Sequence, residues 1–187
     1  MKTTRTDNKN PRAKIMLRAH FLRRYHADQQ PLVFDACQGD AMLWTQLRQE
    51  FDIRYWGVDV KRSKGRLAVR SERVLAQAGW DFDVIDVDTY GQPWTHWLAL
   101  LPHVHKPTTV FLTLGVALLN NSVRAAEHCG IRFKRRIPTA LSGFVQEIIL
   151  DHMWDEARRA GLQIVELREA VTSSRTRYFG LRLEPGG

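Results

Sequence analysis

The sequence predicts a single α/β domain of three layers, in which helices cover both faces of a mostly parallel sheet that ends in an antiparallel hairpin. Apolar segments of strand length alternate with helical patterns through most of the 187 residues. The junction of the last two strands, at Thr172-Ser173-Ser174, is short, which favours a hairpin. An apolar content of 44% is sufficient for a substantial core.

The chain divides into a basic N-terminal part, residues 1–30, and a main domain, residues 31–187. In the first part, apolar side chains recur at helical spacing among basic ones over residues 12–27, which predicts a basic amphipathic helix. Pro31 then opens the first strand, a short apolar segment that ends at Asp35.

Seven strands are expected in the main domain, each a short run of apolar or β-branched residues. They lie at residues 32–35, 53–58, 66–70, 82–87, 108–114, 162–171 and 176–183. Helices are expected between them at 41–50, 72–78, 93–101 and 139–160. Pro93 suits the start of the third of these helices, and Gly161 suits the end of the last.

Basic residues give the chain a net charge of +8 and gather in three separated groups. The groups lie within residues 1–30, 61–73 and 132–136. They would suit the phosphate backbone of a nucleic acid if they line one groove. The alternative is that they are solvated faces that only aid solubility.

Two cysteines, Cys37 and Cys129, are too few for a disulfide framework, and no Cys/His array has zinc spacing. We therefore expect no metal. The polar, charged N-terminus does not resemble a signal peptide, and no segment has the ~20 apolar residues of a membrane span. These features predict a cytoplasmic protein without a membrane partner.

Acidic residues follow the first two strands, where ligands bind in open α/β sheets. Asp35 ends the first strand, Gly39 lies in the following loop, and Asp59 ends the second strand about 20 residues after the glycine. An acidic residue at that distance can reach ribose hydroxyls. A dinucleotide is a rival ligand, but the Gly-x-Gly-x-x-Gly fingerprint is missing, and a cationic sulfonium cofactor needs no pyrophosphate loop. Turn or cap roles remain the alternative for these residues.

The order of elements and this loop resemble the Rossmann-like fold of class I S-adenosylmethionine-dependent methyltransferases, over about residues 31–183. The resemblance implies that S-adenosylmethionine is the cofactor and that one group of residues holds it. The implied cofactor residues are Asp35, Ala36, Gly39, Asp59, Val60, Glu72 and Asp86. Asp35 would face the amino end of the methionine moiety, and Glu72 would lie near the adenine amino group. The single glycine of the loop departs from the family, which often has two or three.

The segment 82–91, Phe-Asp-Val-Ile-Asp-Val-Asp-Thr-Tyr-Gly, is an apolar strand that ends in acidic and aromatic residues. It resembles the Asp-Pro-aromatic-Gly motif of the tRNA guanine-N2 dimethyltransferases, with Thr89 in place of the proline. The resemblance implies that Asp88 orients an amine of the substrate and that Tyr90 stacks on its base. Those enzymes are longer than this chain, and an ordinary strand end is the alternative for the segment.

A long connection, residues 115–138, contains four basic residues that could bind the substrate. They are Arg132, Lys134, Arg135 and Arg136. A surface insertion without function is the alternative.

Together these features predict a methyltransferase acting on an exocyclic amino nitrogen of a nucleic-acid base, with RNA favoured over DNA. A non-catalytic nucleic-acid-binding module with the same fold is a second interpretation. A methyltransferase for a small molecule or a protein is a third.

Overall fold

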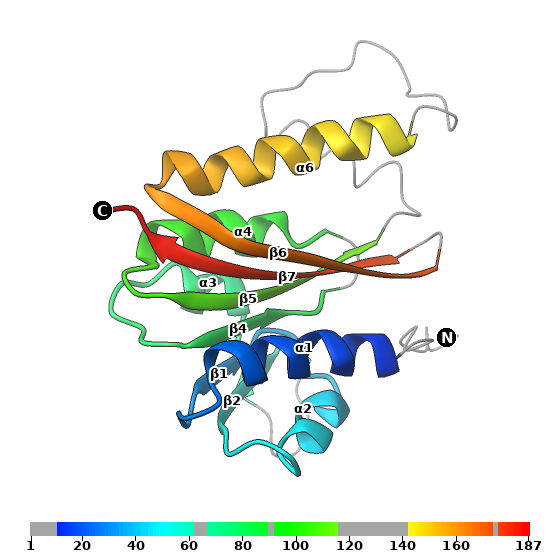
Figure 1. Ribbon diagram of the computed structural model, residues 1–187, viewed down its shortest axis with the longest axis vertical. Helices are drawn as coiled ribbons and strands as arrows, with labels where there is room; N and C mark the ends of the chain where they lie inside the picture. The colour runs from blue at the N-terminus through cyan, green and yellow to red at the C-terminus, as the bar shows by residue number, and fades with distance from the viewer. Residues whose placement is uncertain (1–10, 62–66, 90–91, 116–141, 174–175) are drawn as a thin grey trace.

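A computed structural model describes residues 11–61, 67–89, 92–115, 142–173 and 176–187 (Figure 1). Its seven strands form one sheet in the order β3-β2-β1-β4-β5-β7-β6. The strands are β1 (Leu32–Asp35), β2 (Arg54–Asp59), β3 (Leu67–Ala68), β4 (Val84–Val87), β5 (Thr108–Gly115), β6 (Leu162–Ser173) and β7 (Thr176–Pro185). The described helices are α1 (Pro11–Tyr25), α2 (Met42–Leu47), α3 (Ser71–Leu75), α4 (Trp94–Leu100), the 3₁₀ turn η1 (Leu101–His103) and α6 (Ser142–Arg159).

The pairing of the strands confirms the predicted fold class. Strands β1 to β5 pair in parallel, whereas β7 is antiparallel to both β5 and β6. The terminal hairpin therefore adds β7, which is antiparallel to the five parallel strands, and beyond it β6 at the edge of the sheet. Because β1 lies between β2 and β4, the chain reverses its direction across the sheet at this point. In open α/β sheets, ligands bind at such a reversal, beyond the carboxyl ends of the strands.

Two apolar clusters cover the two faces of the sheet. On one face, side chains such as Phe21 of α1 and Trp44 of α2 pack on Val33 and Val84. On the other face, Phe34 and Val58 of the strands pack in a cluster with α3, α4 and α6. Figure 1 shows α1 and α2 together on one side, and α6 along the hairpin. The alternation of side chains along β1 sends neighbours Val33 and Phe34 to opposite faces.

The expected elements are present, with ends that differ by a few residues. The expected helix at 72–78 is the shorter α3, and the strand expected at 66–70 is the two-residue β3. Gly161 ends α6 with a φ of 77°, a backbone conformation that glycine adopts without the cost of a Cβ. The predicted helix stop is therefore confirmed.

Helix α1 differs from a simple amphipathic helix because two of its basic residues face inward. Lys14 and Arg18 are almost fully buried, together with the apolar Leu17, Phe21 and Leu22. A buried cation is stable only when it is paired and hydrogen-bonded. The site described below supplies those partners.

Candidate active site at the carboxyl edge of the sheet

Three predicted acidic residues meet where β1 and β4 lie side by side. Asp35 at the end of β1 is paired in register with Asp86 of β4. Asp88 follows two positions after Asp86, so strand alternation favours the same face for both. Contacts with α1 place Asp86 and Asp88 on the face that α1 covers. The sheet therefore brings together the carboxylates that the sequence analysis placed at two strand ends.

Asp35 is buried, and its hydrogen-bond donors carry no charge. The Tyr55 hydroxyl donates to it at 2.8 Å, and the backbone N–H of Cys37 donates at 3.2 Å. Burial, followed by the negative charge of Asp86, raises the pKa of Asp35 to about 7. No ion pair joins Asp35 to a cation within the described residues. This carboxyl group is consequently suited to receive a positively charged group of a ligand.

Asp86 is fully engaged inside the protein. Arg18 of α1 donates to both of its oxygens, from Nε at 2.8 Å and from Nη2 at 2.7 Å. The indole N–H of Trp44 donates to the same carboxylate at 2.7 Å. The bidentate pair fixes α1, and the indole hydrogen bond fixes α2, against the end of β4. The structure thus assigns Asp86 a supporting contact, and its predicted contact with the cofactor stays a prediction.

Asp88 is paired with the second inward cation of α1. The ammonium of Lys14 donates to its two oxygens at 2.8 and 2.5 Å. Burial by itself would raise the pKa of Asp88, but Lys14, Arg18 and a hydrogen bond from Thr113 outweigh this effect and lower it. The side chain keeps 19% of its surface exposed. Asp88 is therefore a carboxylate at neutral pH that already accepts N–H donors.

The loop after β1 is fastened to the end of β2. Asp59 accepts hydrogen bonds from the backbone N–H groups of Gly39 at 3.1 Å and Lys61 at 2.9 Å. Gly39 has a φ of 49°, and the loop passes close enough for Gln38 N–H to donate to the Val58 carbonyl at 2.9 Å. The two predicted cofactor residues Gly39 and Asp59 are thus direct neighbours.

The remaining cofactor predictions fall around this loop. Ala36 is buried, and its N–H donates to the Asp86 carbonyl at 2.8 Å. Val60 is 67% exposed just beyond Asp59, so it is open to a planar ligand. Glu72, in the first turn of α3, accepts from Arg70 Nε at 2.6 Å. The predicted contacts of all three with a cofactor stay predictions.

Sequence reasoning missed the residues that support this site from other elements. Tyr55, Trp44, Lys14 and Arg18 all contact the predicted carboxylates. In the sequence, Lys14 and Arg18 are four residues apart, about one helical turn, and this spacing places them on the same face of a helix. Apolar residues recur on the same face at helical spacing, but the sequence does not show which acids the two cations would meet.

Some predicted residues lie outside the described part of the chain. They are Tyr90 and the basic residues Arg132, Lys134, Arg135 and Arg136. The same holds for Cys129. Cys37 is described, and burial together with Asp35 raises the pKa of its thiol, which makes it a poor nucleophile.

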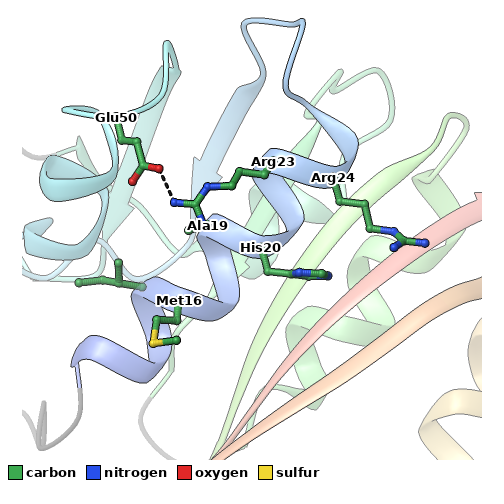
Figure 2. Close-up of a pocket in the computed structure, with 7 residues that line it drawn as sticks. Met16, Ala19, His20, Arg23, Arg24 and Glu50 are labelled. Carbon is green, nitrogen blue, oxygen red and sulfur yellow. Dashed lines mark hydrogen bonds and ion pairs between the residues drawn. The ribbon is translucent and has the colours of Figure 1, made fainter.

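The outward face of α1 carries a shallow hollow of about 490 Å³ (Figure 2). Figure 2 shows Arg23 directed toward Glu50, while His20 and Arg24 extend away from it. His20 and Arg24 both contact Glu166 of β6, and Arg23 pairs with Glu50. Acids therefore partly neutralise the basic residues of this face, which makes it a weak site for phosphates.

None of the helices in the described ranges is long and apolar enough to cross a membrane. A scan against protein-family models finds no match, and a search of curated protein sequences finds none either.

Solved structures with a similar fold were found for almost the whole chain. Trm1 from Pyrococcus horikoshii, in complex with S-adenosyl-L-methionine, superposes with a TM-score of 0.67 at 17% identity. The match covers 95% of this chain and 56% of the Trm1 chain, so this chain spans little more than half of that protein.

Two further structures contain S-adenosylhomocysteine (SAH). The plantazolicin methyltransferase BamL, in complex with a triazolic desmethylPZN analogue and SAH, has a TM-score of 0.59 at 10% identity, covering 95% of this chain and 86% of its own. The 1,6-didemethyltoxoflavin-N1-methyltransferase of Burkholderia thailandensis has a TM-score of 0.55 at 13% identity, covering 96% and 80%. The strand order and these likenesses show that the chain has the Rossmann-like fold of S-adenosylmethionine-dependent methyltransferases.

Proposed function

We propose that the protein is an S-adenosylmethionine-dependent methyltransferase that modifies an exocyclic amino nitrogen of a nucleic-acid base, with RNA favoured over DNA. The observation that carries the proposal is the buried Asp35 carboxyl, which lacks a cationic partner in the described residues and lies beside the Gly39–Asp59 loop. Structures of the same fold hold S-adenosylmethionine or its product, which supports this choice of cofactor.

The residues present fit such a cofactor. Its ammonium group would compensate the Asp35 carboxylate, and its ribose hydroxyls suit Asp59. When bound, the cofactor supplies an electrophilic methyl group and its own leaving group. Asp35, Ala36, Gly39, Asp59, Val60 and Glu72 would hold it, while Asp86 keeps β4 and α1 in place.

Asp88 is proposed to orient the target amine. An amine reacts through its lone pair, so its N–H bonds must be directed elsewhere, and a carboxylate acceptor can do this. Asp88 has the required chemistry because it already accepts N–H bonds from Lys14 and because its lowered pKa keeps it ionised. The substrate amine would share or replace the Lys14 contact. Tyr90 is proposed to stack on the base, and Arg132, Lys134, Arg135 and Arg136 to bind its phosphates.

A small-molecule or peptide substrate is the second candidate. It is favoured by the two structures that hold 1,6-didemethyltoxoflavin and a desmethylPZN analogue as bound compounds. A non-catalytic module with this fold is the third interpretation. All three make different predictions for cofactor binding and methyl transfer.

Calorimetry with S-adenosylmethionine, followed by transfer of labelled methyl groups, separates these candidates. The parent protein is expected to bind the cofactor, and Asp59→Ala to bind it more weakly. Asp151→Asn, which alters an exposed carboxylate of α6, is the matched control and should bind normally. If the parent does not bind, the non-catalytic interpretation replaces the proposal.

Transfer to bulk RNA, DNA, protein and small-molecule extracts then identifies the substrate class. Asp88→Asn is expected to lose transfer while it keeps cofactor affinity. Full transfer by this variant would refute the role proposed for Asp88. Transfer to protein or small molecules alone would refute the nucleic-acid substrate.

A further inference from the structure

The sheet face opposite Asp86 and Asp88 carries a second concave surface, near its edge. It is a groove of about 620 Å³ between β2, α3 and the segment that precedes β4. Its lining includes Trp56, Arg70, Arg73, Gln77, Trp80 and Phe82. Trp56 packs on Phe34, so it lies on the face of the sheet that α3, α4 and α6 cover. Its neighbour Tyr55 points to the opposite face, where it contacts Asp35. The groove is therefore separate from the three carboxylates.

The indole ring of Trp56 is open to this groove. Trp56 lies two positions before Val58, the first residue of β2 that pairs with β3 within the described residues. It keeps 40% of its surface exposed, although Trp residues usually bury most of their area. A large aromatic ring open to a groove is a common feature of binding sites for planar groups.

The exposed ring is held by a set of stacked aromatic side chains. The Trp56 ring lies 5.5 Å from Phe34 and 5.5 Å from Phe82, and Trp80 stacks on Phe82 with ring centres 5.6 Å apart. These contacts fix the orientation of Trp56 from inside the protein. A planar ligand could therefore stack on its open side without first ordering a mobile side chain.

Positive charge borders the aromatic surface. Arg73 of α3 is exposed, and its guanidinium has no hydrogen-bond or ion-pair partner in the part of the chain that the structure describes. Arg70 lines the same groove and pairs with Glu72. The sequence around them, residues 61–73, contains six basic residues and one acid, Glu72. This charge complements an anion.

We propose that this groove, formed by Trp56, Arg70, Arg73, Gln77, Trp80 and Phe82, binds a nucleotide of a single-stranded nucleic acid. The base stacks on Trp56, and the adjoining phosphate contacts Arg73. Stacking on an aromatic ring next to an arginine is how single strands are bound without sequence preference. An aromatic peptide side chain would use the ring but would leave the charge of Arg73 without a partner. The inference goes beyond methyl transfer and does not require it.

Binding of fluorescein-labelled oligouridylate, measured by fluorescence anisotropy at several salt concentrations, tests the proposal. Trp56→Leu keeps apolar contact with the core and is expected to weaken binding about tenfold, within the usual effect of losing one stacked base. Arg73→Gln is expected to weaken binding a few-fold and to reduce the slope of log affinity against log salt by about 1.

Matched variants elsewhere control for general loss of charge or aromatic surface. Phe144→Leu removes an exposed aromatic ring from α6, and Arg48→Gln removes an exposed arginine next to α2. Both are expected to bind the oligonucleotide like the parent. Thermal unfolding checks that Trp56→Leu is folded, and the surface variant Arg73→Gln provides the test if it is not.

Three outcomes would overturn the proposal. The first is that the parent protein fails to bind the oligonucleotide. The second is that Arg73→Gln and a folded Trp56→Leu bind it as tightly as the parent does. The third is that the two variants lose affinity for polyglutamate but not for oligouridylate, which would assign the groove to an acidic protein. A parent that binds no S-adenosylmethionine but binds oligouridylate through Trp56 would refute the methyltransferase proposal and leave this one standing.

Discussion

The carboxylates at the ends of β1 and β4 lie side by side, yet they differ in what neutralises them. Asp86 and Asp88 of the β4 side are each paired with a cation of α1, whereas the donors to Asp35 of β1 are a tyrosine hydroxyl and a backbone N–H. A carboxylate with its own cation holds the fold together or orients a neighbour. A carboxylate without one is poised to take a cation from a ligand, at a cost in stability while no ligand is bound.

The largest effect is expected from Arg18→Met, which leaves the Asp86 carboxylate buried without its cation. The free energy of unfolding should fall by about 3–5 kcal/mol, because an uncompensated buried charge is costly. Urea denaturation measures it. The double variant Arg18→Met/Asp86→Asn should recover a large part of the loss, because the amide oxygen can still accept from Trp44. A loss in the double variant equal to that in the single one would show that packing, and not charge, explains the effect.

The second effect is a pH dependence of stability that comes from Asp35. Its pKa is about 7 in the folded protein, and the unfolded chain releases this proton at its ordinary value near 4. Between these values the folded state binds more protons, so this residue stabilises the fold at low pH and loses that contribution as the pH rises from about 4 to 7.

Comparison with Asp35→Asn isolates this contribution from those of other groups. The stability of the parent relative to this variant is expected to fall by about 2–4 kcal/mol over that range. Denaturation curves at a series of pH values measure the difference. A constant difference would mean that Asp35 has an ordinary pKa and is not the poised carboxylate described here.

The third effect is on the cofactor itself. Asp35→Asn should bind S-adenosylmethionine about 10–100-fold more weakly, because it removes a charged hydrogen-bond partner worth about 1.5–3 kcal/mol. Titration calorimetry measures this, with Asp151→Asn as the control. The parent should also bind more tightly at pH 8 than at pH 6, since Asp35 is then ionised. If Asp35→Asn and the parent bind S-adenosylmethionine with equal affinity, then Asp35 does not contact the cofactor and other residues must hold it.

The smallest effect is expected from Lys14→Met, because Asp88 is partly exposed and keeps the Thr113 hydrogen bond. The pKa of Asp88 should rise. As the pH is lowered, Asp88 is then protonated earlier, and methyl transfer should decline at a higher pH than in the parent. The cost in stability should be about 1 kcal/mol, as for a hydrogen bond that water can partly replace. The pH profile of transfer measures the change, and Lys14→Arg should restore the parent profile. An unaltered pH profile in Lys14→Met would show that Lys14 does not lower the pKa of Asp88.

Much of the fold was predictable from local pattern. The alternation of apolar runs with helical spacing, the short Thr172–Ser174 connection and the stop at Gly161 are each encoded within a few neighbouring residues. For the same reason, Asp35, Gly39, Asp59, Asp86 and Asp88 could be placed at strand ends, where open sheets bind ligands. The lengths of α3 and β3 were less predictable, because tertiary packing decides where such short elements end.

Sequence alone determined which residues occupy the carboxyl edge of the sheet, because that placement follows from strand ends and connections read along the chain. Only the tertiary structure decided how each carboxylate is used. The partners Lys14, Arg18, Trp44 and Tyr55 come from other elements, and a one-dimensional pattern does not show which side chain of a distant helix will meet a given strand. The same packing leaves Asp35 without a cation among the described residues, because the two inward cations of α1 reach β4 instead.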